Sequence, residues 1–216
     1  MKKIGIEIEF FIQDTNTKKI REPSIFGIPC DESGYLGEAR TSPHTEPETL
    51  FSDIIAKLLT YQERIHKKDP FCEMISSSFL KPSIKLQKEY YLKYGKEYEA
   101  IHSIYNTEDN NYLDKYWRAG IHVHFSDSYN RTIGTDKDRE TIEMFKQVNI
   151  PLIIRKFDNT FKDIIKKNKR KLGLYRLKEH GFEYRSLPSV LILEPFLKDS
   201  YKEILSTCKT FFSLFS

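Results

Sequence analysis

Four short segments of this chain each carry two chemically active side chains two positions apart, which is the repeat of a β-strand. They are Glu7 and Glu9 in GIEIEFF, Glu38 and Arg40 in GEART, His122 and His124 in GIHVHFS, and Glu183 and Arg185 in GFEYRSLP. Alternate residues of a strand point to the same face of a sheet. If the four segments share one sheet, a single face gathers carboxylates, imidazoles and guanidiniums. Such a face is more typical of a site for metal ions and phosphate than of a structural surface.

The apolar pattern around these segments predicts interspersed strands and helices. Strands are expected over residues 4–12, 35–41, 71–79, 116–126 and 181–187, and helices over 48–67, 84–105, 136–165 (in two pieces divided near Pro151) and 189–215 (as one or two). The strands alternate apolar and polar residues, which indicates a sheet with one face on helices and one face open. We therefore expect an α+β fold, with a mostly antiparallel twisted sheet and an open concave face, in a single domain over 1–216.

Composition and cysteine usage exclude several classes of protein. The net charge of +4, from 35 basic and 31 acidic residues, is too small to predict a nucleic-acid partner. Cys30, Cys72 and Cys208 are scattered, which argues against a disulfide framework or a cysteine zinc site and suits the cytoplasm. Glu7 and Glu9 interrupt the apolar start of the chain, so we expect no signal peptide and no membrane span. The sequence leaves the oligomeric state open.

Each pair of side chains also has an ordinary explanation. Two strand glutamates can be solvent-exposed, two strand histidines can be hydrogen-bonded structural groups, and a Glu–Arg pair can be an internal ion pair. Adjacent carboxylates repel one another, however, and hard divalent cations prefer oxygen ligands of this kind. One histidine among several carboxylates suits magnesium or manganese better than structural zinc. The presence of all four pairs in one chain favours the metal-site interpretation.

A basic run precedes the last of the four segments and includes Arg170, Lys171 and Arg176. It is either a solvated helix end or a cradle for nucleotide phosphates, which arginine binds bidentately. In the same region, Arg185 next to Glu183 can stabilise a transferring phosphoryl group.

The segments IEIEF, GEAR, GIHVHFS and FEYRSLP, in this order, resemble the pattern of the glutamine synthetase and glutamate–cysteine ligase superfamily. More narrowly, they are similar to its small phage-type carboxylate–amine ligases, the amidoligases, over nearly the whole chain. The resemblance implies a glutamine synthetase-like catalytic domain that uses ATP and two or three Mg²⁺ or Mn²⁺ ions. It also implies formation of an amide from a small-molecule or peptide carboxylate and an amine, through an acyl phosphate.

The resemblance further implies roles for individual residues. Glu7, His122 and Glu183 are expected to bind the ion on the β- and γ-phosphates, and Glu9 and Glu38 the ion nearer the second substrate. Catalytic roles are implied for Arg185, Arg176 and Glu183, nucleotide contacts for His124, Arg176 and Arg185, and substrate contacts for Arg40 and Glu38. The basic run adds Arg170 and Lys171 to the expected nucleotide contacts.

The chain also departs from the larger relatives. It is short, and we expect it to lack the additional N-terminal domain of glutamine synthetase. Its second segment offers one clear carboxylate, Glu38, where glutamine synthetase uses two, and Asp31 and Glu46 are the alternatives for the other. Two further functions fit the same residues, namely a metal-dependent hydrolase that activates water and a non-catalytic nucleotide- or metal-binding protein. The arginines favour the ligase.

Overall fold

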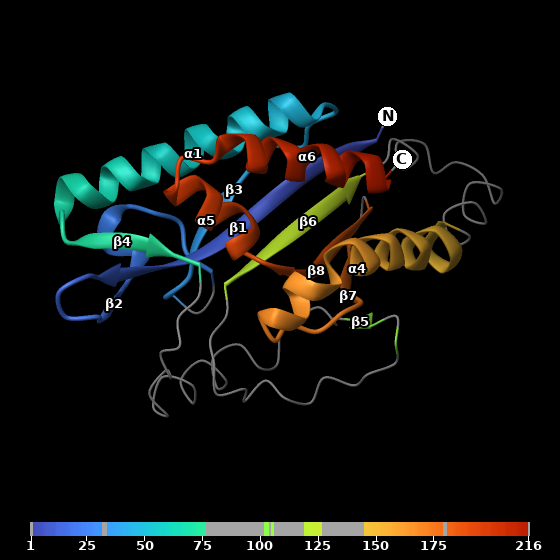
Figure 1. Cartoon of the computed structure of the whole chain (residues 1–216), viewed down its shortest axis with the longest axis horizontal. Helices are drawn as coiled ribbons and strands as arrows, with labels where there is room; N and C mark the ends of the chain where they lie inside the picture. The colour runs from blue at the N-terminus through green and yellow to red at the C-terminus, as the bar shows by residue number, and fades with distance from the viewer. Residues whose placement is uncertain are drawn as a thin grey trace.

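A computed structural model describes residues 2–31, 34–76, 102–103, 105, 119–126, 145–178 and 181–215. These residues form an α+β fold in which α-helices cover one face of a mostly antiparallel sheet (Figure 1). None of the described helices has both the length and the apolar character needed to cross a membrane.

The sheet is built around its long first strand. The strands are β1 (Lys3–Asp14), β2 (Ile20–Arg21), β3 (Gly37–Arg40), β4 (Cys72–Ile75), β5 (His102–Ser103), β6 (Gly120–Ser126), β7 (Leu174–Lys178) and β8 (Gly181–Pro188). Their order is β2-β1-β6-β8-β7-β5, and β3 and β4 also pair with β1. Glu7 and Ile8 have partners on both β3 and β6, so this part of β1 lies inside the sheet.

Prolines mark the starts of the two long helices of the described residues. They are η1 (Pro23–Phe26), α1 (Pro47–Lys68), the π-helical turn η3 (Phe145–Asn149), α4 (Ile150–Lys167), α5 (Val190–Leu197) and α6 (Tyr201–Phe215). Pro47 and Pro151 lie in the first turns of α1 and α4, where proline costs no backbone hydrogen bond. In α1 the buried residues Leu50, Ile54 and Leu58 recur every four residues and form the stripe that faces the core.

The alternation of side chains along β1 separates the core from the open face. Its even-numbered residues, from Ile4 to Ile12, are at most 1% exposed and join the main apolar cluster. On the same face of the sheet the rings of Phe125 and Phe182 stack, with their centroids 4.7 Å apart. Each such buried side chain contributes about 1.5–3 kcal/mol. This packing fixes the register, so the odd-numbered Glu7 and Glu9 must point to the other face.

Most predicted elements are confirmed where the structure describes them. The strand expected over 4–12, the helix expected over 48–67 and the division near Pro151 correspond to β1, α1 and the boundary between η3 and α4. The expected strands over 35–41 and 116–126 contain β3 and β6, β8 extends one residue beyond the strand expected over 181–187, and the last helical region divides into α5 and α6. Residues 77–79, 84–101, 116–118 and 136–144 lie outside the described residues.

Two corrections concern the edge of the sheet. The helix expected over 84–105 is wrong at its end, because His102 and Ser103 form β5 and pair with β7. The sequence analysis also missed β7 itself, which lies in the basic run and pairs with β8. For β5, pairing with a distant part of the chain outweighs the local pattern, whereas β7 forms a hairpin with the neighbouring β8.

Candidate metal and phosphate site

The four segments lie in one sheet, and their side chains form rows across neighbouring strands. On β1, Glu7 is paired with Arg40 of β3 on one side and with His122 of β6 on the other. The next row on β1 pairs Glu9 with Glu38. Because directly paired residues of a sheet have neighbouring side chains, the rows bring residues far apart in the sequence into contact.

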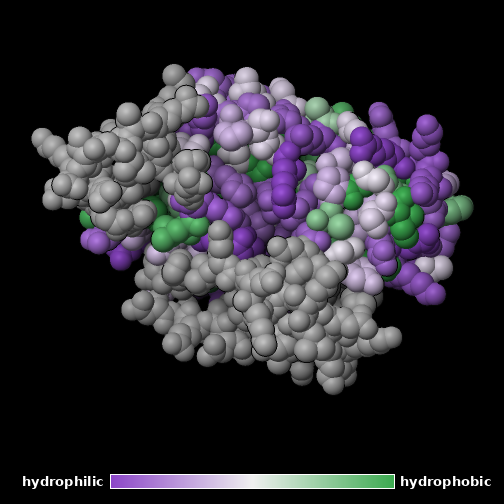
Figure 2. All heavy atoms as spheres, turned by 180° about the vertical axis from the view of Figure 1, so that it is seen from behind, coloured by the Kyte–Doolittle hydropathy of each residue, from purple (hydrophilic) through white to green (hydrophobic). Residues whose placement is uncertain are grey.

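A further row crosses the other half of the sheet. His124 of β6 is paired with Glu183 of β8, which is paired in turn with Arg176 of β7. The described helices lie on the opposite face, and Figure 2 shows hydrophilic side chains gathered in the middle of the face that these helices leave uncovered.

Burial divides the ionisable groups of this face into a floor and a rim. The floor consists of buried Glu7, Glu9, Glu38, His122 and Glu183. The rim carries cations: the side chain of Arg40 is 64% exposed and that of Lys178 is 37% exposed. The imidazole of His124 is also 37% exposed, and burial lowers its pKa, which favours the neutral form. A floor of carboxylates under a cationic rim suits a cation below and an anion above it.

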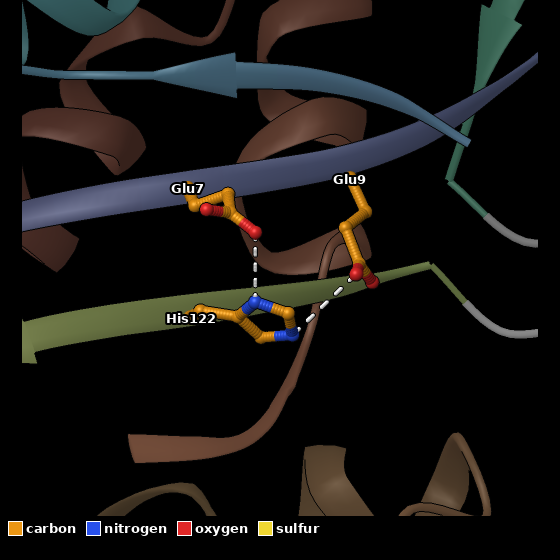
Figure 3. A group of neighbouring side chains, drawn as sticks. All are labelled: Glu7, Glu9 and His122. Atoms are coloured by element: carbon orange, nitrogen blue, oxygen red, sulfur yellow. Dashed lines mark hydrogen bonds and ion pairs between the residues drawn. The ribbon is translucent and has the colours of Figure 1, made fainter. Parts of the chain in front are cut away.

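The centre of the floor is a cluster of Glu7, Glu9 and His122 (Figure 3). His122 Nδ1 lies 3.0 Å from Glu7 Oε1, and His122 Nε2 lies 3.5 Å from Glu9 Oε1. One ligand atom from each of the three residues lies within 4.8 Å of the other two. Ligands of Mg²⁺ or Ca²⁺ lie about 2.0–2.6 Å from the ion, so two ligands of one ion are about 4–5 Å apart at most. The spacing and the donor types therefore fit a divalent cation.

Glu7, Glu38 and Glu183 also have positive partners. Arg40 binds two of them, with Nε 2.9 Å from Glu7 Oε2 and Nη2 2.5 Å from Glu38 Oε2. Glu183 is surrounded by Arg185, by Lys178 at 3.3 Å and by Arg176 at 4.0 Å. Part of the face is thus an internal ion-pair network, which was one of the ordinary explanations of the sequence pattern.

Glu9 is different from the other carboxylates. One of its oxygens, Oε2, accepts a hydrogen bond of 2.7 Å from the backbone N–H of Gly120, and Oε1 faces His122. No lysine or arginine of the described residues forms an ion pair with Glu9. Within the described part of the chain, the ion-pair explanation therefore leaves the buried Glu9 with the Gly120 N–H and the imidazole of His122 as its partners.

The pKa values of neighbouring carboxyls on this face shift in opposite directions. Burial opposes the ionisation of Glu7, but the hydrogen bond with His122 and the nearby charges hold its pKa well below the usual range. Burial and the charge of Glu7 raise the pKa of Glu38 to about 8. Burial also opposes ionisation of Glu183, whose pKa is nevertheless lowered by the charges of His122 and Arg185. With its raised pKa, Glu38 is largely protonated near pH 7, so Arg40 balances the charge of Glu7 and a further cation is needed before Glu38 ionises.

Most residues selected from the sequence lie in this cluster, whereas the basic residues Arg170 and Lys171 lie in the turn between α4 and β7. The described contacts bring together Glu7, Glu9, Glu38, Arg40, His122, His124, Arg176, Glu183 and Arg185. Arg170 donates hydrogen bonds to the backbone carbonyls of Ser186 and Arg185, and Lys171 is exposed between α4 and β7. The negative charge of Asp31 acts on Glu38, whereas Glu46 is exposed next to the start of α1.

Two contributors to the site were not identified from the sequence. Gly120 supplies the N–H that binds Glu9, and Lys178 supplies a cation to Glu183. A sequence signal existed for the second, because Arg176 and Lys178 are also two positions apart. That signal was hidden because β7 was interpreted as part of a charged run.

A second group of potential ligands lies at the far end of β1, where single ligand atoms of Asp14, Asp69 and Cys72 are within 4.8 Å of one another. Arg21 Nη1 lies 3.6 Å from Asp14 and 3.8 Å from Asp69, so a cation of the protein already serves both carboxylates. Burial, with the hydrogen bond to Asp69, raises the pKa of Cys72 to about 11. A protonated thiol is a poor metal ligand, and this group is a structural ion-pair cluster.

No known protein family, curated protein or solved structure matches this chain. Its function is therefore inferred from the side chains themselves. Buried carboxylates with an imidazole can bind a divalent cation, and the arginines and lysine around them can bind the oxygens of an anion such as phosphate.

Proposed function

We propose that this protein is an ATP-dependent carboxylate–amine ligase with a glutamine synthetase-like catalytic domain. The observation that carries the proposal is the buried cluster of Glu7, Glu9 and His122 under a rim of arginine and lysine, on the face of the sheet opposite the described helices. A simple cation site has no need of the rim, and a simple phosphate site has no need of the carboxylates. Both are needed where metal ions and a polyphosphate are bound together.

Two or three Mg²⁺ or Mn²⁺ ions would be bound by residues of the floor, namely Glu7, Glu9, Glu38, His122 and Glu183. The ions would neutralise the phosphate oxygens of ATP. Glu9 fits this role best, because among the described residues no lysine or arginine forms an ion pair with it. Arg40, with its largely exposed side chain, is the candidate for binding the substrate carboxylate.

The reaction has two steps. A carboxylate oxygen of the acid attacks the γ-phosphorus of ATP, ADP leaves, and an acyl phosphate forms. The nitrogen of the amine then attacks the acyl carbon, phosphate leaves, and the nitrogen loses a proton to give the amide. Arg185 and Arg176, next to Glu183, would stabilise the charge on the transferring phosphoryl oxygens. Lys178, on the same carboxylate, adds a further cation.

The decisive experiment measures ADP release by the purified protein with ATP, Mg²⁺ or Mn²⁺, and mixtures of carboxylic acids and amines, with product detection by mass spectrometry. We expect ADP formation that depends on both an acid and an amine, and its loss in Glu7→Gln and Glu183→Gln. Glu48→Gln is the matched control, because Glu48 is exposed on α1 and its ion pair with Lys209 lies on the surface. Wild-type rates in Glu7→Gln or Glu183→Gln would refute the assigned roles.

The competing functions give different results in the same experiment. A metal-dependent hydrolase would cleave a test substrate in the absence of ATP and would form no amide. A non-catalytic binder would show a thermal shift with Mg-ATP and release no ADP with any mixture.

A further inference from the structure

Arg170, in the turn between α4 and β7, contacts the backbone of two strands that carry the candidate site. Its Nε donates a hydrogen bond of 3.1 Å to the carbonyl oxygen of Ser186, and its Nη2 donates one of 2.6 Å to the carbonyl oxygen of Arg185. Both carbonyls belong to β8. A planar guanidinium can hold two acceptors at once in a fixed geometry, which an ammonium group cannot do.

The two carbonyls lie at an irregularity in the pairing of β6 with β8. The paired positions on either side of His122 are two residues apart on β6 but three apart on β8, so Arg185 and Ser186 together face His122. A bulge of this kind interrupts the ladder of backbone hydrogen bonds and changes the direction of a side chain. This bulge of β8 lies in the middle of the candidate site, where Arg185 contacts Glu183.

The same guanidinium packs against Gly120, the first residue of β6. A Cβ atom on Gly120 would lie 2.5 Å from Nη2 and 2.8 Å from Cζ of Arg170, so a larger residue would displace the arginine. This position is two residues from His122 and therefore faces the same side of the sheet. Its N–H binds Glu9. Arg170 thus touches the backbone next to Glu9 and next to Arg185.

We propose that Arg170 is a positioning residue, which fixes the bulge of β8 and the start of β6 and thereby sets the spacing of Glu9, His122 and the Glu183–Arg185 pair. This role replaces the nucleotide contact expected for Arg170 from the sequence. The effect on strand geometry stands on the hydrogen bonds alone. The effect on ion binding rests on the proposed function.

The test compares Arg170→Ala and Arg170→Lys with the wild-type protein, and uses Lys167→Ala, an exposed lysine in the last turn of α4, as the charge-matched control. The NMR signals of the Gly120 amide and the His122 imidazole report the geometry, and calorimetry with Mn²⁺ alone reports ion binding. We expect Arg170→Ala to shift both signals and to weaken Mn²⁺ binding about 10–100-fold. Arg170→Lys should behave similarly, whereas Lys167→Ala should match the wild type.

Unchanged NMR signals of Gly120 and His122 in a folded Arg170→Ala variant would overturn the proposal. If Arg170→Ala does not fold, the Arg170→Lys variant decides, and signals of Gly120 and His122 that match the wild type would overturn the proposal. Normal Mn²⁺ binding with weakened nucleotide binding would assign Arg170 to phosphate and would also overturn it. If the wild-type protein binds no Mn²⁺, the ion site of the proposed function fails, and the NMR signals still decide the role of Arg170.

Discussion

The guanidinium of Arg40 lies between two buried carboxylates, Glu7 and Glu38, and forms ion pairs with both. Without a further cation, an ionised Glu38 is unfavourable, because burial and the charge of Glu7 raise its pKa to about 8. A group that opposes folding is retained where function requires it. This conflict between stability and function can be measured at a single residue.

We expect Glu38→Gln to leave the free energy of unfolding in the presence of a chelator unchanged or higher, because glutamine removes the repulsion and keeps the shape. The same change should weaken Mn²⁺ binding about tenfold or more, since an oxygen ligand loses its charge. Urea denaturation and calorimetric titration measure the two effects. A marked loss of stability with unchanged Mn²⁺ affinity would instead make Glu38 a structural partner of Arg40.

Single residues of the site were predictable from sequence as far as a spacing of two could reveal them. The pairs on β1, β3, β6 and β8 were identified because each pair lies within one strand. The hydrogen bond from Gly120 to Glu9 and the contact of Lys178 with Glu183 depend on the register between strands. Register is decided by packing of the apolar face and by bulges, neither of which is visible in the local pattern.

The connection between β3 and α1 is held to the helix by one carboxylate. Asp53 Oδ2 accepts hydrogen bonds from His44 Nε2 at 2.9 Å and from the N–H of Ser42 at 3.0 Å, and Lys57 lies 3.7 Å from Oδ1. Burial opposes the ionisation of Asp53, but the hydrogen bonds with His44 and Ser42 bring its pKa below the usual value. An acid with a lowered pKa in the folded state stabilises the fold above its unfolded pKa, and this contribution disappears as the pH falls.

We therefore expect Asp53→Asn to lower the free energy of unfolding by about 1 kcal/mol at pH 7. The difference from the wild type should shrink as the pH falls below about 3.9, the ordinary pKa of aspartic acid, because the wild-type carboxyl then becomes protonated. Urea denaturation at a series of pH values measures the difference, with Asp163→Asn, an exposed position on α4, as the control. A difference that is independent of pH would show that shape, and not charge, fixes this connection.

Behind the site, α4 is joined to the sheet by a second buried carboxylate. Asp158 Oδ1 accepts hydrogen bonds from the hydroxyl of Tyr184 at 2.7 Å and from the N–H of Gly173 at 3.0 Å, and Oδ2 accepts one from Tyr105 at 3.0 Å. Asp158 and Tyr184 are buried, whereas Tyr105 is 45% exposed. Water can replace the hydroxyl of Tyr105 but not that of Tyr184.

We expect Tyr184→Phe to reduce the free energy of unfolding by about 1.5–3 kcal/mol, because a buried carboxylate loses a donor. Tyr105→Phe should cost less, about 0.5–1.5 kcal/mol. Neither change should alter Mn²⁺ affinity, since Tyr184 points to the helices and the ion-binding side chains point away from them. Equal costs for the two variants, in chemical denaturation, would contradict this account of the network.

At the scale of the whole molecule, the α+β class and the open face followed from the alternation of apolar and polar residues. The edge of the sheet did not, because β5 and β7 are short and polar and exist through pairing with strands that come later in the chain. The candidate site lies in the predictable part, where a continuous apolar face fixes the direction of every second side chain. The same core that holds the strands in register therefore also holds the ionisable groups together.

This coupling predicts that divalent cations stabilise the entire fold. The central donors come from Glu7, Glu9 and His122, which meet only when β1 and β6 pair, so the unfolded chain has no such site. A ligand that binds only the folded state at 100 times its Kd adds about 2.7 kcal/mol to the free energy of unfolding. For a chain of this size the melting temperature should rise by about 5–10 °C in saturating Mn²⁺.

Calorimetric melting with Mn²⁺ and with a chelator measures this shift. Glu7→Gln should abolish it, whereas Glu48→Gln, which changes an exposed glutamate of α1, should retain it in full. The size of the shift should also follow the logarithm of the Mn²⁺ concentration above the Kd, which separates binding to the folded state from a general salt effect. A melting temperature that does not respond to Mn²⁺ would mean that these carboxylates are neutralised by arginine and histidine alone.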